Sequence, residues 1–204
     1  MPVDPEHTAT DEPANEAVDG DWCSSFAPVW RADARVLILG SVPGRRSLAE
    51  QRYYAHPRNA FWQIVEQVCG VPATQPYGQR LQGLIECGVA LWDVIGRCRR
   101  RGSLDQRIER ETIEVNPVGR LLGRCPELRC IVFNGAAAET AFRRHVLKDL
   151  AGRADGLRLV RLPSTSAANA MRPVAGKVEI WRATLEGVLR RDSVCGSRRQ
   201  SRPF

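Results

Sequence analysis

The sequence has no apolar run that approaches the roughly 20 residues needed by a helix that crosses a membrane. It also lacks the basic segment followed by an apolar segment that marks a secretory signal. We therefore expect a cytoplasmic protein with no membrane partner. In that compartment the seven cysteines are expected to be reduced thiols. The 204 residues, 43% of them hydrophobic, fit one globular domain with unstructured ends.

Spacings typical of metal sites are also missing. No Cys-x-x-Cys occurs, and Cys125 and Cys130 are separated by four residues. The three histidines, His7, His56 and His145, are scattered along the chain. We therefore expect no zinc or iron–sulfur site and no other metal. A catalytic Cys–His pair stays open as an alternative, although no spacing in the sequence indicates a particular pair.

Lysine is scarce, because only Lys148 and Lys177 contribute to the 30 basic residues. Residues 1–20 hold six acids and no basic residue, so the rest of the chain carries a net charge of +13. This charge favours a polyanionic partner, although a solvated basic surface is the alternative. We predict an acidic, disordered segment at 1–20, a folded domain at 21–190 and a flexible basic tail at 191–204.

Short apolar runs typical of strands alternate with segments of helical periodicity, which predicts an α/β fold with a mainly parallel sheet. Four strands are expected, at residues 35–39, 89–92, 130–133 and 157–162. Helices are expected at residues 59–69, 118–125, 136–150 and 178–190.

Functional loops of a parallel sheet follow the carboxyl ends of its strands, and here these loops carry unusual residues. They are Gly-Ser-Val-Pro-Gly at 40–44, Tyr-Tyr-Ala-His-Pro-Arg-Asn-Ala-Phe-Trp at 53–62, Asp93 with the basic run 97–101, Asn134-Gly135, and the Ser/Thr-rich segment 163–170. The glycines at 40–44 would expose backbone N–H groups to a ligand, but the Gly-Lys-Ser/Thr end of a nucleotide P-loop is missing. Plainer interpretations stay open: Asn59 as a helix cap, Phe61 and Trp62 as buried wall, and 163–170 as an ordinary loop.

Taken together, these segments resemble the uracil-DNA glycosylase superfamily, and most closely its hypoxanthine-DNA (DNA-deoxyinosine) glycosylase branch. The resemblance covers about residues 35–190, and the segments at 40–62 carry most of it. Gly-Val-Ala-Leu-Trp-Asp-Val-Ile at 88–95, Arg-Gly-Ser-Leu-Asp at 101–105 and Leu-Pro-Ser-Thr-Ser at 162–166 follow in the expected order. The resemblance implies a three-layer α/β/α fold with a short four-stranded sheet. It also implies a monofunctional enzyme that hydrolyses the N-glycosidic bond of a deaminated purine in DNA without a cofactor and leaves an abasic site.

The chain departs from the superfamily at three positions. Val42 stands where most members have Asp or Asn, Leu162 stands where uracil enzymes have a catalytic His, and Ala167 stands where the branch usually has Pro. A valine cannot hold the attacking water, so that task must have moved. By resemblance to the hypoxanthine branch, Asn59 is the residue expected to carry it.

The resemblance also implies roles for the other candidate residues. The catalytic group is Asn59, Ser41, Gly40 and His56. The base-binding group is Phe61 as the stacking ring, Tyr54 as second choice, Asp93 as acceptor for N1–H of hypoxanthine, Val42 and Pro43. The DNA-binding group is Gly44, Arg45, Ser164, Thr165, Ser166, Asn169, Arg99, Arg100 and Arg101.

The expected partner is double-stranded or single-stranded DNA that contains a deaminated base. We expect a monomer, associated with the nucleoid if the cell is prokaryotic. Two other functions stay open. One is a glycosylase specific for uracil or for G:U and G:T mismatches, and the other is a basic DNA-binding module without catalysis.

Overall fold

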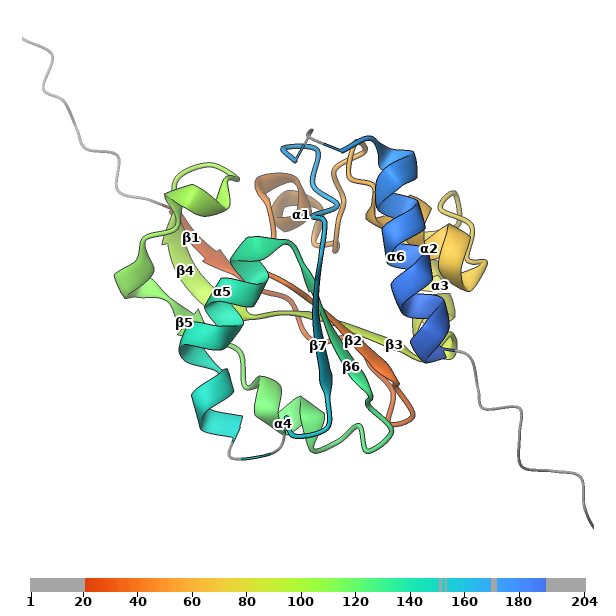
Figure 1. Cartoon of the computed structure of the whole chain (residues 1–204). Helices are drawn as coiled ribbons and strands as arrows, with labels where there is room; N and C mark the ends of the chain where they lie inside the picture. The colour runs from red at the N-terminus through yellow and green to blue at the C-terminus, as the bar shows by residue number, and fades with distance from the viewer. Residues whose placement is uncertain (1–20, 151, 153, 170–171, 190–204) are drawn as a thin grey trace, which may run out of the picture.

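Four strands form a parallel sheet in the order β3-β2-β6-β7 (Figure 1). They are β2 (Val36–Gly40), β3 (Val89–Asp93), β6 (Cys130–Asn134) and β7 (Arg158–Leu162). Strands β2 and β3 are buried at every residue, as expected of parallel strands covered on both faces. All four predicted strands and their parallel arrangement are therefore confirmed.

The computed structural model describes residues 21–189 except 151, 153, 170 and 171. The predicted acidic segment 1–20 and basic tail 191–204 lie outside these residues. Within the described part, no helix has both the length and the apolar character needed to cross a bilayer.

Helices cover both faces of the sheet (Figure 1). Helices α2 (Phe61–Cys69), α3 (Tyr77–Glu86) and α6 (Val174–Leu189) lie on one side, and α5 (Ala136–His145) lies on the other. Two shorter helices are α1 (Arg45–Glu50) and α4 (Val118–Leu122). Apolar residues of α2 recur every three or four positions and are buried, so this helix contributes one face to the core.

The predicted helices exist, but their limits differ from the expected ones. Helix α2 begins at Phe61 rather than at residue 59, and the side chain of Asn59 accepts the Phe61 N–H from outside the helix. The segment expected as one helix at 136–150 is divided into α5 and a 3₁₀ turn, Leu147–Leu150. Helix α6 begins four residues before the expected position 178.

A second, antiparallel sheet was not predicted. It consists of β1 (Asp21–Ser24), β4 (Ile95–Arg100) and β5 (Glu114–Val115), in the order β1-β4-β5. Strand β4 contains most of the run expected to be a basic loop, and its side chains alternate between the two faces. Cys98 and Arg100 therefore point inward, while Arg97 and Arg99 point outward.

Candidate active site

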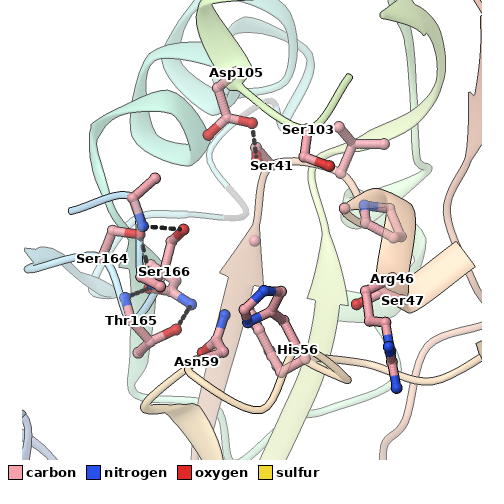
Figure 2. A pocket seen from close by; sticks show the side chains of 18 of the residues that line it. Ser41, Arg46, Ser47, His56, Asn59, Ser103, Asp105, Ser164, Thr165 and Ser166 are labelled. Carbon is pink, nitrogen blue, oxygen red and sulfur yellow. Dashed lines mark hydrogen bonds between the residues drawn. The ribbon is translucent and has the colours of Figure 1, made fainter. Parts of the chain in front are cut away.

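A cavity of about 430 Å³ opens at the carboxyl edge of the parallel sheet. The last residues of three strands, Gly40, Asp93 and Asn134, line it together with Ser164, just after β7. Figure 1 shows α1 and the segment after β7 at the same end of the sheet. The loops selected from the sequence therefore meet at one cavity, except for the basic run 97–101, which does not line it (Figure 2).

The first-motif loop (residues 40–47) forms one wall of this cavity. No described residue accepts a hydrogen bond from the backbone N–H of Ser41, Val42 or Gly44, so these groups are available to a ligand. Val42 and Pro43 are buried wall residues with no side-chain polar atom. The Ser41 hydroxyl donates to Oδ1 of Asp105 over 2.8 Å.

Asn59 lines the cavity from the segment before α2 (Figure 2). Its Oδ1 accepts the Phe61 N–H over 3.0 Å, and no described residue accepts from its Nδ2. The neighbouring N–H of Ala60 donates to the Thr165 carbonyl, which ties this segment to the loop after β7. With its oxygen occupied, the amide of Asn59 presents a hydrogen-bond donor to the cavity rather than a base.

His56 also lines the cavity, and its side chain is exposed. Its Nδ1 accepts the backbone N–H of Arg58 over 3.2 Å, which leaves Nε2 as the nitrogen available to a ligand. Arg58 is an exposed residue of the same rim that the sequence did not select.

The prediction that Phe61 stacks on a bound base is wrong. Its side chain has no exposed surface and does not line the cavity, because Tyr54 covers it. The two rings stack with centroids 4.0 Å apart, and Tyr54 faces the cavity. Tyr54 has a φ of 52°, in the left-handed region that residues other than glycine seldom adopt. Tyr54, the second choice, is therefore the ring of this pair that lines the cavity.

Asp93 lies at the cavity floor, with only 4% of its surface exposed. Ser25 donates to its Oδ2 over 2.9 Å, whereas Oδ1 lies close to Gly40. A Cβ at position 40 would lie 2.4 Å from this Oδ1, so only glycine leaves room for the carboxyl group. Burial raises the pKa of Asp93 from 3.8 to about 7, against the opposing hydrogen bond from Ser25.

The second-motif loop (residues 163–169) is held by polar contacts with Asn134, the last residue of β6. Asn134 accepts the Thr165 N–H over 2.8 Å and donates to its hydroxyl over 2.9 Å. Thr165 is 1% exposed, so the prediction that it contacts DNA is wrong, because its side chain points inward to Asn134. Ser164 and Ser166 line the cavity, whereas Asn169 does not.

Helix α6 holds the same loop from behind. Lys177 is buried and donates to the carbonyls of Ser166 and Asn169, over 3.2 and 2.8 Å. The indole of Trp181 donates to the Pro163 carbonyl over 2.9 Å. These contacts set the position of the loop without placing either helix residue in the cavity.

The predicted phosphate-binding arginines have different surroundings. Arg100 is 1% exposed and donates to the carbonyls of Pro43 and Gly102, over 2.6 and 3.0 Å. The prediction that it binds DNA is therefore wrong, because it supports the first-motif loop from inside. Arg99 lies over the Trp22 ring on the outer face of β4, and neither Arg99 nor the exposed Arg101 lines the cavity. Arg45 is exposed at the cavity edge and forms an ion pair with Asp21.

Sequence reasoning missed several residues that shape this site. Asp105 and Ser103 reach the cavity from the connection between β4 and β5. Asn134 directly follows a predicted strand, and this position could have indicated that it holds the second-motif loop. Lys177 is one of two lysines and lies one residue before the helix predicted at 178–190, and its burial depends on packing that no local pattern shows. Among the described residues, no group of His, Cys, Asp or Glu side chains could hold a metal ion.

Residues 28–185, a range that includes every residue lining the cavity, match the family model for the uracil DNA glycosylase superfamily. A hypoxanthine DNA glycosylase of Methanosarcina barkeri (strain Fusaro) is 36% identical over 111 residues, which are 54% of this chain and 69% of the relative. Another hypoxanthine DNA glycosylase, from Methanosarcina acetivorans, is 34% identical over 145 residues, 71% of this chain and 86% of that protein. The solution NMR structure of a candidate uracil DNA glycosylase from Methanosarcina acetivorans has a TM-score of 0.69 and 30% identity, over 82% of this chain and 99% of that chain.

Proposed function

The chain belongs to the uracil DNA glycosylase superfamily and is a DNA glycosylase, and from this premise we propose that the base it removes is hypoxanthine. The observation that carries the proposal is that Asp93 and Asn59 line one cavity, with the Tyr54 ring in the same wall. The two relatives described as hypoxanthine DNA glycosylases support this choice. We further propose that the enzyme acts as a monomer on nucleoid DNA, and size-exclusion chromatography with light scattering tests the oligomeric state.

The substrate base must leave the DNA stack to reach such a cavity. Extrusion costs a few kcal/mol and is easiest for a weakly paired base, such as hypoxanthine opposite thymine. Ser164 and Ser166 on the second-motif loop, with Arg45 and Arg58 on the rim, are placed to bond phosphates beside the extruded nucleotide. These contacts make binding sensitive to salt.

Asp93 explains how hypoxanthine would be distinguished from adenine. Its free Oδ1 accepts a hydrogen bond from N1–H of hypoxanthine, whereas N1 of adenine carries a lone pair in the same place. An ionised Asp93 facing adenine would stay buried and unpaired, at a cost of about 1 to 3 kcal/mol or more. Asp93 therefore serves as the residue that selects the base, and Tyr54 supplies the stacking surface.

Bond cleavage leaves negative charge on the departing base and positive charge on the sugar. The free amide donor of Asn59 and the backbone N–H groups of the first-motif loop are positioned to stabilise the base as it leaves. The loss of one such preorganised donor typically slows a reaction by about 10² to 10³-fold. Asn59→Ala should therefore reduce the rate of excision by that factor. It should also cost about 1 kcal/mol of stability, because the Phe61 N–H loses its acceptor.

The test uses a panel of duplexes that contain inosine, uracil, xanthine or a thymine mismatch. After single-turnover reactions, the DNA is cleaved at the abasic sites, and the amount of cleaved strand measures excision. The variants are Asn59→Ala, Asp93→Asn and, as a matched control, Gln67→Ala, which removes an exposed amide on α2 that does not line the cavity. We expect the parent and Gln67→Ala to prefer inosine, Asn59→Ala to be slow, and Asp93→Asn to lose preference for inosine.

Other outcomes would redirect the proposal. Preference for uracil or for a thymine mismatch would assign the enzyme to that specificity instead. Salt-dependent binding with no abasic product from any duplex would indicate a DNA-binding module. Excision of inosine by Asn59→Ala at the parent rate would remove Asn59 from the mechanism, and an unchanged preference in Asp93→Asn would remove Asp93 as the selecting residue.

A further inference from the structure

The cavity contains a carboxylate beside the first-motif loop that the roles proposed for Asn59 and Asp93 do not use. Val42 cannot bind the attacking water, and the amide of Asn59 cannot accept a proton at neutral pH. Asp105 lines the same cavity, although it lies in a different segment, and its Oδ1 accepts the Ser41 hydroxyl over 2.8 Å (Figure 2). The first-motif loop thus acquires an acidic partner from a residue 64 positions away in the chain.

We propose that Asp105 is the general base of this enzyme, holding the attacking water and accepting its proton, with Ser41 as the residue that positions it. This inference rests on the proposed glycosylase reaction and adds a catalytic residue to it. The function follows from position, because Asp105 accepts a hydrogen bond from Ser41, the neighbour of Val42, which stands where most members have a polar side chain.

Three contacts hold the segment of Asp105 against the first-motif loop. The Ser103 hydroxyl accepts the backbone N–H of Arg45 over 3.1 Å, and Ser41 donates to Asp105. The buried guanidinium of Arg100 joins the two segments by donating to Pro43 on one side and Gly102 on the other. Since these contacts fix Oδ1, the other carboxylate oxygen stays free, and no described residue donates to it.

The surroundings of Asp105 make its carboxylate more basic than an exposed one. The residue begins the 3₁₀ turn Asp105–Arg107 and is open to solvent within a concave part of the surface. Enclosure by the cavity walls raises the pKa of Asp105, while the hydrogen bond from Ser41 and the charge of Arg100 oppose this rise. Asp93, Tyr54 and the buried Cys98 are further titratable groups that interact with its charge. A carboxylate with a raised pKa is a stronger base than an ordinary one.

The chemical step balances with water as the only co-reactant. The water oxygen forms a bond to C1′ of the sugar as the bond from C1′ to N9 of hypoxanthine breaks. The electron pair of the broken bond leaves with the base, which takes a proton from solvent. One proton of the water passes to the free oxygen of Asp105 and is then released to solvent.

The test measures single-turnover excision of inosine by Asp105→Asn and Asp105→Glu, with Glu111→Gln as matched control. Glu111 is exposed in the same connection between β4 and β5 but does not line the cavity, so its change removes an equal charge. Loss of a general base typically costs about 10² to 10⁴-fold. We expect a loss of about 100-fold or more in Asp105→Asn, partial recovery in Asp105→Glu, and parent rates in Glu111→Gln. Binding to a duplex with an uncleavable inosine analogue should change less than about threefold, because the proton transfer occurs after binding.

Ser41→Ala gives an independent readout that a purely structural role would not produce. Activity requires ionised Asp105, so it is lost as pH falls through the pKa of that residue. Removing the Ser41 hydrogen bond takes away a contact that lowers this pKa. The acidic limb of the pH–rate profile should therefore move to higher pH in Ser41→Ala.

The outcomes separate this inference from the proposed function. If the parent and Glu111→Gln do not excise inosine, the proposed function fails and the inference fails with it. If they excise inosine while Asp105→Asn stays within about threefold of them, only the inference is overturned. An unmoved acidic limb in Ser41→Ala would likewise overturn it, even if Asp105→Asn proved too unstable to assay.

Discussion

Replacing Asp93 with asparagine should stabilise the protein at alkaline pH while it impairs selection of the base. The carboxyl group is 4% exposed and its burial raises its pKa to about 7. Asparagine has nearly the same shape and retains an oxygen that can accept the hydrogen bond from Ser25. The substitution therefore removes a buried charge without creating a large cavity.

The sign and size of the effect follow from the two pKa values. The native pKa of about 7 lies above the ordinary 3.8, so the native state binds the proton more tightly than the unfolded chain. The stability that protonation contributes is complete below the unfolded value and is lost as pH rises through about 7. The difference between the two pKa values corresponds to about 4 kcal/mol. Asp93→Asn should therefore raise the free energy of unfolding by about 2 to 4 kcal/mol near pH 8. Near pH 5 the gain should be only about 1 to 2 kcal/mol, because Asp93 is then mostly protonated in the native state.

The measurement is urea unfolding of the parent and Asp93→Asn at both pH values, followed by tryptophan fluorescence. Asp149→Asn is the matched control, since Asp149 is exposed outside the cavity and its replacement should not alter the difference between the two pH values. A gain for Asp93→Asn that is the same at both pH values, or a loss that grows with pH, would show that the buried carboxyl carries no such cost.

Two further substitutions test the supports of the cavity. Gly40→Ala should destabilise the protein by about 1 to 3 kcal/mol and slow excision, because its Cβ would lie 2.4 Å from Oδ1 of Asp93; an unchanged urea midpoint would contradict this expectation. Lys177→Met should lower stability by about 1 to 3 kcal/mol and weaken DNA binding, because the carbonyls of Ser166 and Asn169 lose a charged donor. Thermal melting and fluorescence anisotropy measure these two effects, and unaltered DNA binding would show that the second-motif loop does not need this anchor.

Local patterns are sufficient to predict the parallel sheet and the end of it that carries the site. Short apolar runs bounded by turns identify buried strands, and the residues that follow each run show the chemistry of its loop directly. The antiparallel sheet is harder to foresee, since the alternating arginines of β4 resemble a solvated basic segment. Their arrangement depends on pairing with β1, whose partner residues lie more than 70 positions away in sequence.

The direction of individual side chains was decided by tertiary packing. Phe61 and Tyr54 are both aromatic residues of one motif, but only packing against α2 shows which ring covers the other. Arg100 and Thr165 look like surface residues in sequence, yet each turns inward to satisfy backbone or side-chain groups of a distant loop.

The amino-acid sequence by itself determined the strands of the parallel sheet, the loops at their carboxyl ends and the family, because all three depend on residues that are close together in the chain. Only the tertiary structure brought Asp105 to Ser41 and set Asp93 over Gly40. Hydrogen bonds and burial act over a few ångströms in space regardless of separation in sequence. The charge states and available donors of this site therefore emerge only when the chain is folded.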